Sequence, residues 1–130
     1  MVLYLSIDQI EALHDSQLEE YGGSRGIRER GGLEAAVARP SMTFGGEDLY
    51  PDLAAKAAAL MHSLVMNHPF VDGNNRVGAQ AALVFLLVNE SDLIVTSDEL
   101  VDITMALARG EVDAESLAIW FRQRISTETP

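Results

Sequence analysis

The chain has 130 residues, of which 48% are hydrophobic, and 20 acidic residues against nine lysines and arginines give a formal net charge of −11. This length predicts one globular domain with a single core, and the acidic balance argues against direct binding of a nucleic-acid backbone. Cysteine is absent, which excludes disulfides, a thiolate zinc site and a cysteine nucleophile, and fits an expected cytoplasmic location.

The first predicted elements are an extended segment at residues 2–5 and a long helix. Ser6 and Gln9 match a capping box, in which two side chains satisfy backbone N–H groups at the start of a helix. The helix is expected to run to about Tyr21, where Gly22 and Gly23 end it.

A short helix is predicted at residues 33–39, closed by Pro40 and followed by a loop that contains two glycines. Nearby arginines favour two interpretations. They form either a docking patch for an acidic partner or a phosphate, or a solvated face paired with Glu29 and Glu34. These arginines are Arg25, Arg28, Arg30 and Arg39.

Two apolar helices flank residues 68–73. Pro51 suits the first turn of a helix that reaches about residue 66, and Pro69 prevents its continuation. Residues 75–89 predict a helix that is apolar almost all round, which indicates a central, buried position. Its longest apolar run, residues 81–88, is far shorter than the about 20 residues that cross a bilayer, so we expect no membrane partner.

The C-terminal part predicts a short strand at residues 93–95 and two further helices. Capping signals at residues 96–99 begin one helix that ends near Arg109, and Asp113 begins another that ends near Arg124. Residues 126–130 are expected to be a loose tail. The prediction is an all-α fold with at most short β segments, in a single domain of residues 1–125.

The densest chemistry lies in residues 68–76, which read His-Pro-Phe-Val-Asp-Gly-Asn-Asn-Arg. His68 can accept a proton from a hydroxyl near neutral pH, and Asp72 can hold Mg²⁺ against phosphate. Gly73 and Asn74 can turn successive backbone N–H groups toward an anion. Arg76 adds a fixed positive charge with bidentate geometry.

Two further features support a phosphate site. Asn74, Asn75 and Arg76 begin the second apolar helix, whose free N–H groups and dipole favour phosphate. Phe70 is expected to point into the core and lock the loop, so that His68 and Asp72 face outward.

This stretch resembles the signature of the Fic/Doc superfamily, H-x-F-x-[D/E]-[G/A]-N-[G/K]-R, and in particular the death-on-curing (Doc) toxins. The resemblance extends in the usual order of the family from about residue 4 to about residue 122. It implies a compact Fic/Doc-type helical domain that uses ATP and Mg²⁺. The implied catalytic residues are His68, Asp72 and Arg76, the nucleotide-binding residues are Gly73, Asn74, Asn75 and Arg76, and the metal-binding residue is Asp72.

The resemblance also implies an activity and partners. A Doc-type toxin of a type II toxin–antitoxin pair transfers the γ-phosphate of ATP to a Ser or Thr hydroxyl of a translation protein, and elongation factor Tu is the family precedent. A cognate antitoxin, partly disordered until it binds, is the implied partner.

The sequence departs from both branches of the family. Fic proteins that transfer AMP carry a second arginine at the position of Ala79, and Doc relatives carry lysine at the position of Asn75 and usually threonine at that of Val77. Two alternatives therefore stay open: a protein adenylyltransferase, and a catalytically weak Doc-fold module that binds a partner.

Three further predictions concern residues outside the motif. His62 is expected to be a hydrogen-bonded structural histidine, although a role in orienting the motif loop is possible. His14 is expected at the surface. Asp48 and Tyr50 lie in the loop that forms a flap over the acceptor segment in Fic relatives, so this loop is either a docking element or a plain surface loop.

Overall fold

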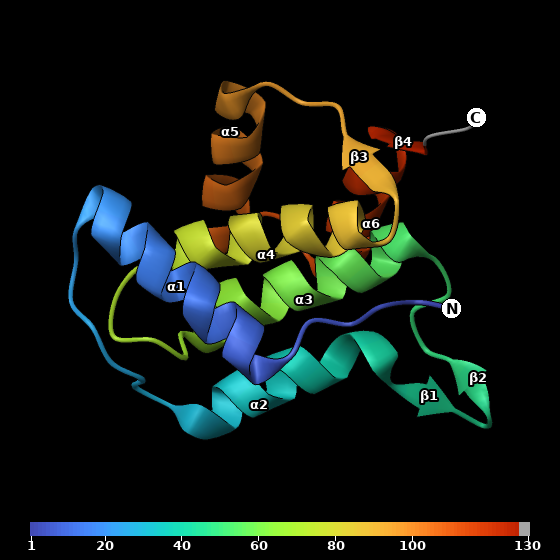
Figure 1. Cartoon of the computed structure of the whole chain (residues 1–130). Coiled ribbons are helices and arrows are strands. Elements are labelled where there is room, and N and C mark those ends of the chain that lie inside the picture. The colour runs from blue at the N-terminus through green and yellow to red at the C-terminus, as the bar shows by residue number, and fades with distance from the viewer. Residues whose placement is uncertain (128–130) are drawn as a thin grey trace.

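The computed structural model describes residues 1–127, and the all-α class is confirmed. Figure 1 shows two antiparallel helices in the middle, with the other helices and two small sheets around them. The helices are α1 (Ile7–Tyr21), α2 (Arg30–Ala38), α3 (Leu53–Asn67), α4 (Asn74–Val88), α5 (Ser97–Ala108) and α6 (Ala114–Arg122), with a 3-10 turn, η1 (Arg39–Ser41). The strands are β1 (Thr43–Phe44), β2 (Glu47–Asp48), β3 (Ser91–Leu93) and β4 (Ile125–Thr127).

The predicted capping residues begin three of the six α-helices in the described part of the chain. Ser6 and Gln9 form the complete capping box of α1, and Thr96 and Glu99 form that of α5. The Asp113 carboxylate accepts a hydrogen bond from the Ser116 N–H at the start of α6. These short-range hydrogen bonds satisfy N–H groups that a helix leaves free, which is why the sequence alone located them.

Helix α3 begins at Leu53, two residues after Pro51, which was predicted to lie in its first turn. Asp52, rather than Pro51, makes the transition into the helix, because its carboxylate accepts a hydrogen bond from the Ala55 N–H at 2.9 Å. The same carboxylate receives two hydrogen bonds from Arg122 of α6, at 2.7 and 3.1 Å. Arg122 therefore lowers the pKa of Asp52 and ties α6 to the beginning of α3.

The most enclosed helix is α3, whereas the sequence placed the central helix after the motif. Residues along almost the whole of α3 are buried, and five of them are alanines, which let neighbouring helices approach closely. Helix α4 runs antiparallel to α3 and buries the side that carries Val77, Ala81 and Phe85. Its opposite side is only partly covered, because α1 and α5 stand apart there and leave a groove.

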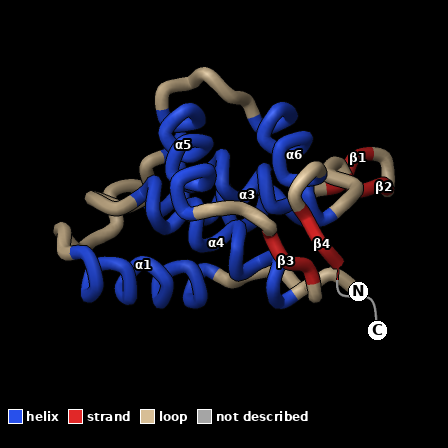
Figure 2. The backbone as a smooth tube through the Cα atoms, turned by 90° about the horizontal axis from the view of Figure 1, so that it is seen from above, coloured by secondary structure: helices blue, strands red, loops and turns tan. Residues whose placement is uncertain are grey.

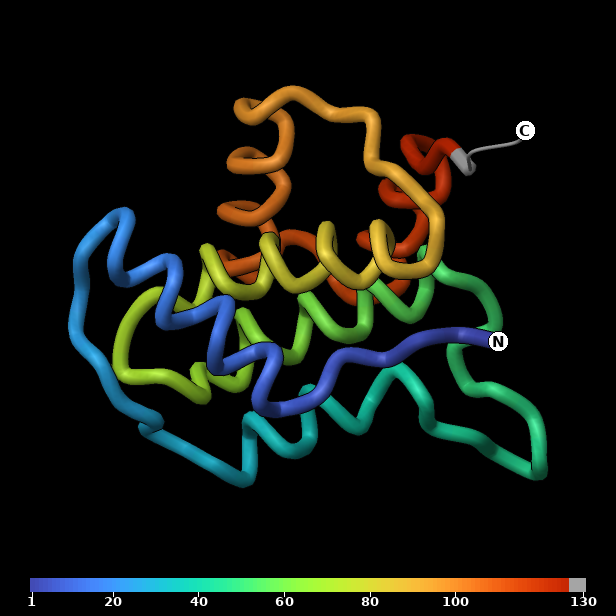
Figure 3. The backbone as a smooth tube through the Cα atoms, in the orientation of Figure 1, coloured from blue at the N-terminus to red at the C-terminus, as the bar shows by residue number. Residues whose placement is uncertain are grey.

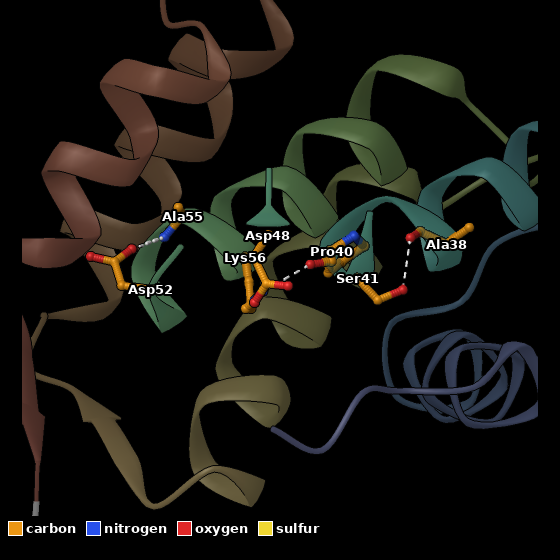
Figure 4. Close-up of polar contacts among 7 residues, drawn as sticks. All are labelled: Ala38, Pro40, Ser41, Asp48, Asp52, Ala55 and Lys56. Atoms are coloured by element: carbon orange, nitrogen blue, oxygen red, sulfur yellow. Dashed lines mark hydrogen bonds and ion pairs between the residues drawn. The ribbon is translucent and has the colours of Figure 1, made fainter. Parts of the chain in front are cut away.

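The β1–β2 hairpin lies at the end of α3 that is remote from the motif, as Figure 1 shows. The 15 residues of α3 separate the two places by about 22 Å, at a rise of about 1.5 Å per residue. The hairpin is therefore no flap over His68 in this structure. Figure 4 shows how Asp48 of β2 is held instead: Lys56 of α3, which is 1% exposed, bonds the Asp48 carboxylate at 3.1 Å and the Pro40 carbonyl at 3.3 Å.

Strands β3 and β4 pair antiparallel and so bring the segment after α4 next to the segment after α6. Figure 2 shows them side by side, and Leu93 pairs with Ile125 while Asp92 pairs with Ser126. The strand after α4 begins two residues earlier than predicted, at Ser91. Residues 126 and 127 of the expected tail lie in β4, and residues 128–130 are outside the described part of the chain. Within residues 1–127, no helix is both long and apolar enough to span a membrane.

Candidate active site

His68 ends α3 in an uncommon backbone conformation. Its φ of 46° and ψ of 55° are left-handed, which turns the chain sharply while the imidazole stays exposed at the rim of the groove. Arg28 supports this turn: its Nε donates to the His68 carbonyl at 2.8 Å and its Nη2 donates to the Asn67 carbonyl at 3.0 Å. A guanidinium at the C-terminus of a helix also complements the negative end of the helix dipole.

The segment before α2 runs alongside the motif loop. The N–H groups of Arg28 and Glu29 both donate to the Pro69 carbonyl, at 2.8 and 3.0 Å, and the Val71 N–H donates to the Gly26 carbonyl at 3.0 Å. Figure 3 shows the two loops at the same end of the molecule, where α1 and α3 end and α2 and α4 begin. The motif loop is therefore held on its outer side by backbone hydrogen bonds as well as by the core.

Phe70 is the predicted anchor, and it is 2% exposed. Asn74 locks it in place, because its side-chain oxygen accepts from the Phe70 N–H at 2.9 Å and its side-chain nitrogen donates to the Phe70 carbonyl at 3.0 Å. The oxygen and the nitrogen of the Asn74 side-chain amide thus both form hydrogen bonds within the protein. The backbone N–H of Asn74 is left for an anion.

The Asp72 carboxylate is exposed and oriented by two backbone groups. The Ser24 N–H donates to Oδ2 at 3.2 Å, and the Gly73 N–H donates to Oδ1 at 2.9 Å. The Gly73 N–H therefore faces the carboxylate, not an incoming anion as the sequence suggested. No group of three acidic, histidine or cysteine side chains in residues 1–127 could hold a metal, so a cation at Asp72 would take its other ligands from phosphate and water.

The N-terminus of α4 has the properties of an anion site. Gly73 precedes the helix with a φ of 79°, and no side chain of the described residues caps the helix there. The N–H groups of Asn74, Asn75 and Arg76 have no partner within the helix, since they lie in its first turn. Arg76 is exposed on the same turn, with its guanidinium carbon 4.3 Å from the centre of the Tyr21 ring.

The motif loop and the first turn of α4 line a groove of about 910 Å³. His68, Asp72 and Arg76 lie at its polar end, and the predicted binding residues Gly73, Asn74 and Asn75 also line it. Its other end is mainly apolar. The side chains there come from α4 and α5 and include Ala79, Leu83, Leu100, Val101 and Met105. The structure thus brings all six predicted site residues to one concave surface large enough for a nucleotide.

His14 is a residue of the site that sequence reasoning missed, because it was expected at the surface. It is 3% exposed, its ring stacks on Phe70 with centroids 3.8 Å apart, and its Nε2 lies 2.7 Å from the Asp72 carbonyl oxygen. A signal was present: His14 follows Ile10 and precedes Leu18 at intervals of four residues, the spacing of one helix face, and both of these residues are buried.

The four arginines of residues 25–39 do not form one patch. Arg25 pairs with Asp15 and Arg30 with Glu11, so no described ion pair involves Glu29 or Glu34. Arg28 binds the motif loop. Arg39 has neutral partners instead, since it donates to the Tyr50 hydroxyl at 2.7 Å, the His62 Nδ1 at 2.9 Å and the Ser63 hydroxyl at 2.9 Å.

His62 is the hydrogen-bonded structural histidine that was predicted. Burial lowers its pKa below the usual value, Arg39 lowers it further, and Asp113 opposes both effects. His62 therefore resists protonation in the folded protein.

The chain is similar to known proteins of one family. The family model of the Fic/DOC family matches residues 4–86. The chain is 43% identical over 100 residues to Toxin Doc of Mycolicibacterium smegmatis, which covers 75% of this chain and 77% of the relative. It is 32% identical over 120 residues to Protein kinase doc of Escherichia phage P1, which covers 92% of this chain and 94% of the relative. The chain therefore belongs to the Fic/Doc family.

Proposed function

We propose that the protein is a Doc-type toxin of a toxin–antitoxin pair, a kinase that transfers the γ-phosphate of ATP to a Ser or Thr hydroxyl of a translation protein. The observation that carries this proposal is the convergence of His68, Asp72 and the uncapped N-terminus of α4 on one groove. The relative from phage P1 is named a protein kinase and the mycobacterial relative a toxin, which supports the same assignment.

Each residue has a defined task in this reaction. His68 takes the proton of the acceptor hydroxyl while the hydroxyl oxygen forms a bond to the γ-phosphorus and the bond from that phosphorus to the bridging oxygen of ADP breaks. The N–H groups that begin α4 and the Arg76 guanidinium hold the phosphates. Asp72 would bind Mg²⁺, which neutralises phosphate charge when it is present.

The expected orientation of the nucleotide depends on the second arginine of the Fic proteins, which Ala79 replaces here. In Fic proteins that transfer AMP, a second arginine holds the outer phosphates so that the α-phosphate faces the histidine. Ala79 occupies that position here, in the wall of the groove, and cannot bind phosphate. The γ-phosphate is therefore the group expected next to His68, and adenylylation is the weaker candidate.

A partner-binding module with little activity is the remaining candidate, and Asn75 is the residue that favours it. Asn75 lines the groove in the first turn of α4, where Doc relatives carry lysine. Its amide can donate hydrogen bonds but brings no charge, and charge-assisted hydrogen bonds are roughly twice as strong as neutral ones. We therefore expect slower transfer than in relatives with lysine.

The proposed partners follow the family. The acceptor is a translation protein, with elongation factor Tu as the first protein to test, and the groove beside the site is regulated by a cognate antitoxin that is partly disordered when free. The protein would act in the cytoplasm, where both partners reside.

The experiment is incubation of the protein with Mg²⁺, elongation factor Tu and ATP labelled at either the γ- or the α-phosphate. The kinase assignment predicts label on the factor from γ-labelled ATP alone, and a loss of about 100-fold or more in His68→Ala. His68 is exposed, so this variant should fold normally. Label from α-labelled ATP would instead establish adenylylation, and no label with an active control kinase would leave the binding module.

A further inference from the structure

His14 belongs to α1, outside the motif, yet it touches the motif loop twice. Its ring is almost parallel to that of Phe70, with an angle of 10° between the planes, and its Nε2 is 2.7 Å from the Asp72 carbonyl oxygen. A carbonyl oxygen can only accept a hydrogen bond, so Nε2 must carry the proton. His14 therefore donates to the backbone of the residue whose side chain is the proposed metal ligand.

The peptide group between Asp72 and Gly73 transmits this contact to the carboxylate. A trans peptide is planar, with its C=O and N–H pointing in opposite directions. When the Asp72 carbonyl points at His14, the Gly73 N–H must point the other way, and there it donates to Asp72 Oδ1 at 2.9 Å. One hydrogen bond inside the protein thus fixes the direction of another at its surface.

We propose that His14 is a positioning residue that orients the Asp72 carboxylate through the Asp72–Gly73 peptide group. This inference rests on the proposed function, in which Asp72 binds the Mg²⁺ that accompanies ATP. His14 itself touches neither substrate nor metal, since its side chain is buried beneath the loop.

Apart from the hydrogen bond from His14, little in the surroundings fixes the orientation of the Asp72–Gly73 peptide group. Gly73 has a φ of 79°, where the backbone of glycine is especially free to rotate. A Cβ built on Gly73 would lie 3.5 Å from His14 Nε2, so the imidazole packs directly against this flexible position. The Ser24 N–H, at 3.2 Å from Oδ2, gives the carboxylate its other contact in the described structure.

Two substitutions separate the hydrogen bond from the stacking. His14→Phe keeps an aromatic ring against Phe70 but removes the donor. His14→Gln keeps an N–H donor close to the position of Nε2 but removes the ring. Ile10→Val is the matched control, because Ile10 is fully buried one turn earlier on α1 and its side chain has neither a ring nor a hydrogen-bond donor.

The first readout needs no activity. In hydrogen-exchange NMR of the protein alone, His14→Phe should speed the exchange of the Gly73 and Ser24 N–H groups, because both donate to the Asp72 carboxylate. His14→Gln and Ile10→Val should leave both exchange rates near their original values. Unchanged exchange in His14→Phe, or equally fast exchange in His14→Gln, would overturn the proposal.

The second readout is the Mg²⁺ dependence of phosphoryl transfer. His14→Phe should raise the Mg²⁺ concentration for half-maximal rate by about tenfold, as is typical when the residue that orients a metal ligand is lost. The rate at saturating Mg²⁺ should recover most of its original value, and His14→Gln should restore the Mg²⁺ dependence. An unaltered Mg²⁺ dependence in His14→Phe would contradict the proposal.

The two hypotheses can fail separately. If the original protein transfers no phosphate, the proposed function fails, and the exchange of the Gly73 and Ser24 N–H groups still decides whether His14 orients Asp72. If His14→Phe does not fold, His14→Leu takes its place, since it also removes the donor: faster exchange in His14→Leu than in His14→Gln supports the proposal, and equal exchange overturns it.

Discussion

Gly23 offers the sharpest test of the position of Asp72, because it lies outside the motif and has a matched neighbour. Gly23 and Gly22 follow α1 with φ angles of 123° and 79°, conformations that residues with a side chain rarely adopt. A Cβ at Gly22 would meet no atom within 4 Å, whereas a Cβ at Gly23 would lie 2.8 Å from Asp72 Oδ2 and 3.0 Å from Leu18 Cδ2. Gly22→Ala therefore introduces backbone strain alone, whereas Gly23→Ala introduces strain, a collision with the carboxylate and a tight contact with the movable end of the Leu18 side chain.

The magnitudes follow from these distances. Backbone strain at a positive φ costs on the order of 1–3 kcal/mol, so both variants should lose stability of that size. To regain an ordinary contact of 3.4 Å, the Asp72 carboxylate must retreat by roughly 0.6 Å from a Cβ at Gly23. Catalytic groups need placement within about 0.5 Å, so we expect Gly23→Ala to reduce kcat/KM by about 10- to 100-fold.

The assay combines urea unfolding with phosphoryl transfer to elongation factor Tu. The predicted result is similar destabilisation of the two variants, with a loss of transfer confined to Gly23→Ala. Equal activity of both variants would refute the argument that the exact placement of Asp72 matters. Equal loss in both would assign the effect to strain in the loop after α1.

Three further predictions concern other residues. Arg28→Lys replaces the two rigidly spaced nitrogens that donate to the His68 and Asn67 carbonyls by one ammonium nitrogen, so the turn is held less firmly and kcat should fall about tenfold while the KM for ATP changes little, which steady-state kinetics would measure. Asn75→Lys adds a charge at the phosphate site and should raise the transfer rate about fivefold, whereas Gln123→Lys, the same charge change at the end of α6, should not; equal rates in the two variants would contradict a role for charge at residue 75. The pKa of His62 is lower in the folded protein than its usual value of about 6.5. The stability that neutral His62 contributes is therefore present above about pH 6.5 and is lost as the pH falls through the folded pKa. Between about pH 7 and pH 5, Tm should fall less in His62→Gln than in the original protein.

Features determined by neighbours in sequence were predicted well. The helix starts at Ser6, Thr96 and Asp113 depend on hydrogen bonds that span three residues, and the sequence shows them directly. Phe70 was predicted as the buried anchor because the polar residues around it must face away from the core. The sequence also predicted that His68 and Asp72 lie on a loop between two apolar helices, and the structure has this loop between α3 and α4.

Features determined by distant contacts were harder to predict. The conformation of His68 depends on Arg28, 40 residues away, and that of Asp72 depends on His14, 58 residues away. No local pattern links these pairs, so Arg28 was assigned to a surface cluster. His14 was assigned to the surface although its spacing from Ile10 and Leu18 indicated the buried face of α1. The α3–α4 pair shows the same limit: both helices are apolar, and only their packing shows that α3 is the more enclosed.

The central claim, that His68 and Asp72 serve γ-phosphate transfer, is tested most directly by intact-mass spectrometry of elongation factor Tu after incubation with the protein, Mg²⁺ and ATP. The account predicts a mass gain of one phosphoryl group, which disappears with His68→Ala. A gain of one AMP would contradict the proposed orientation of the nucleotide, and an unchanged mass would contradict the proposed action on this factor.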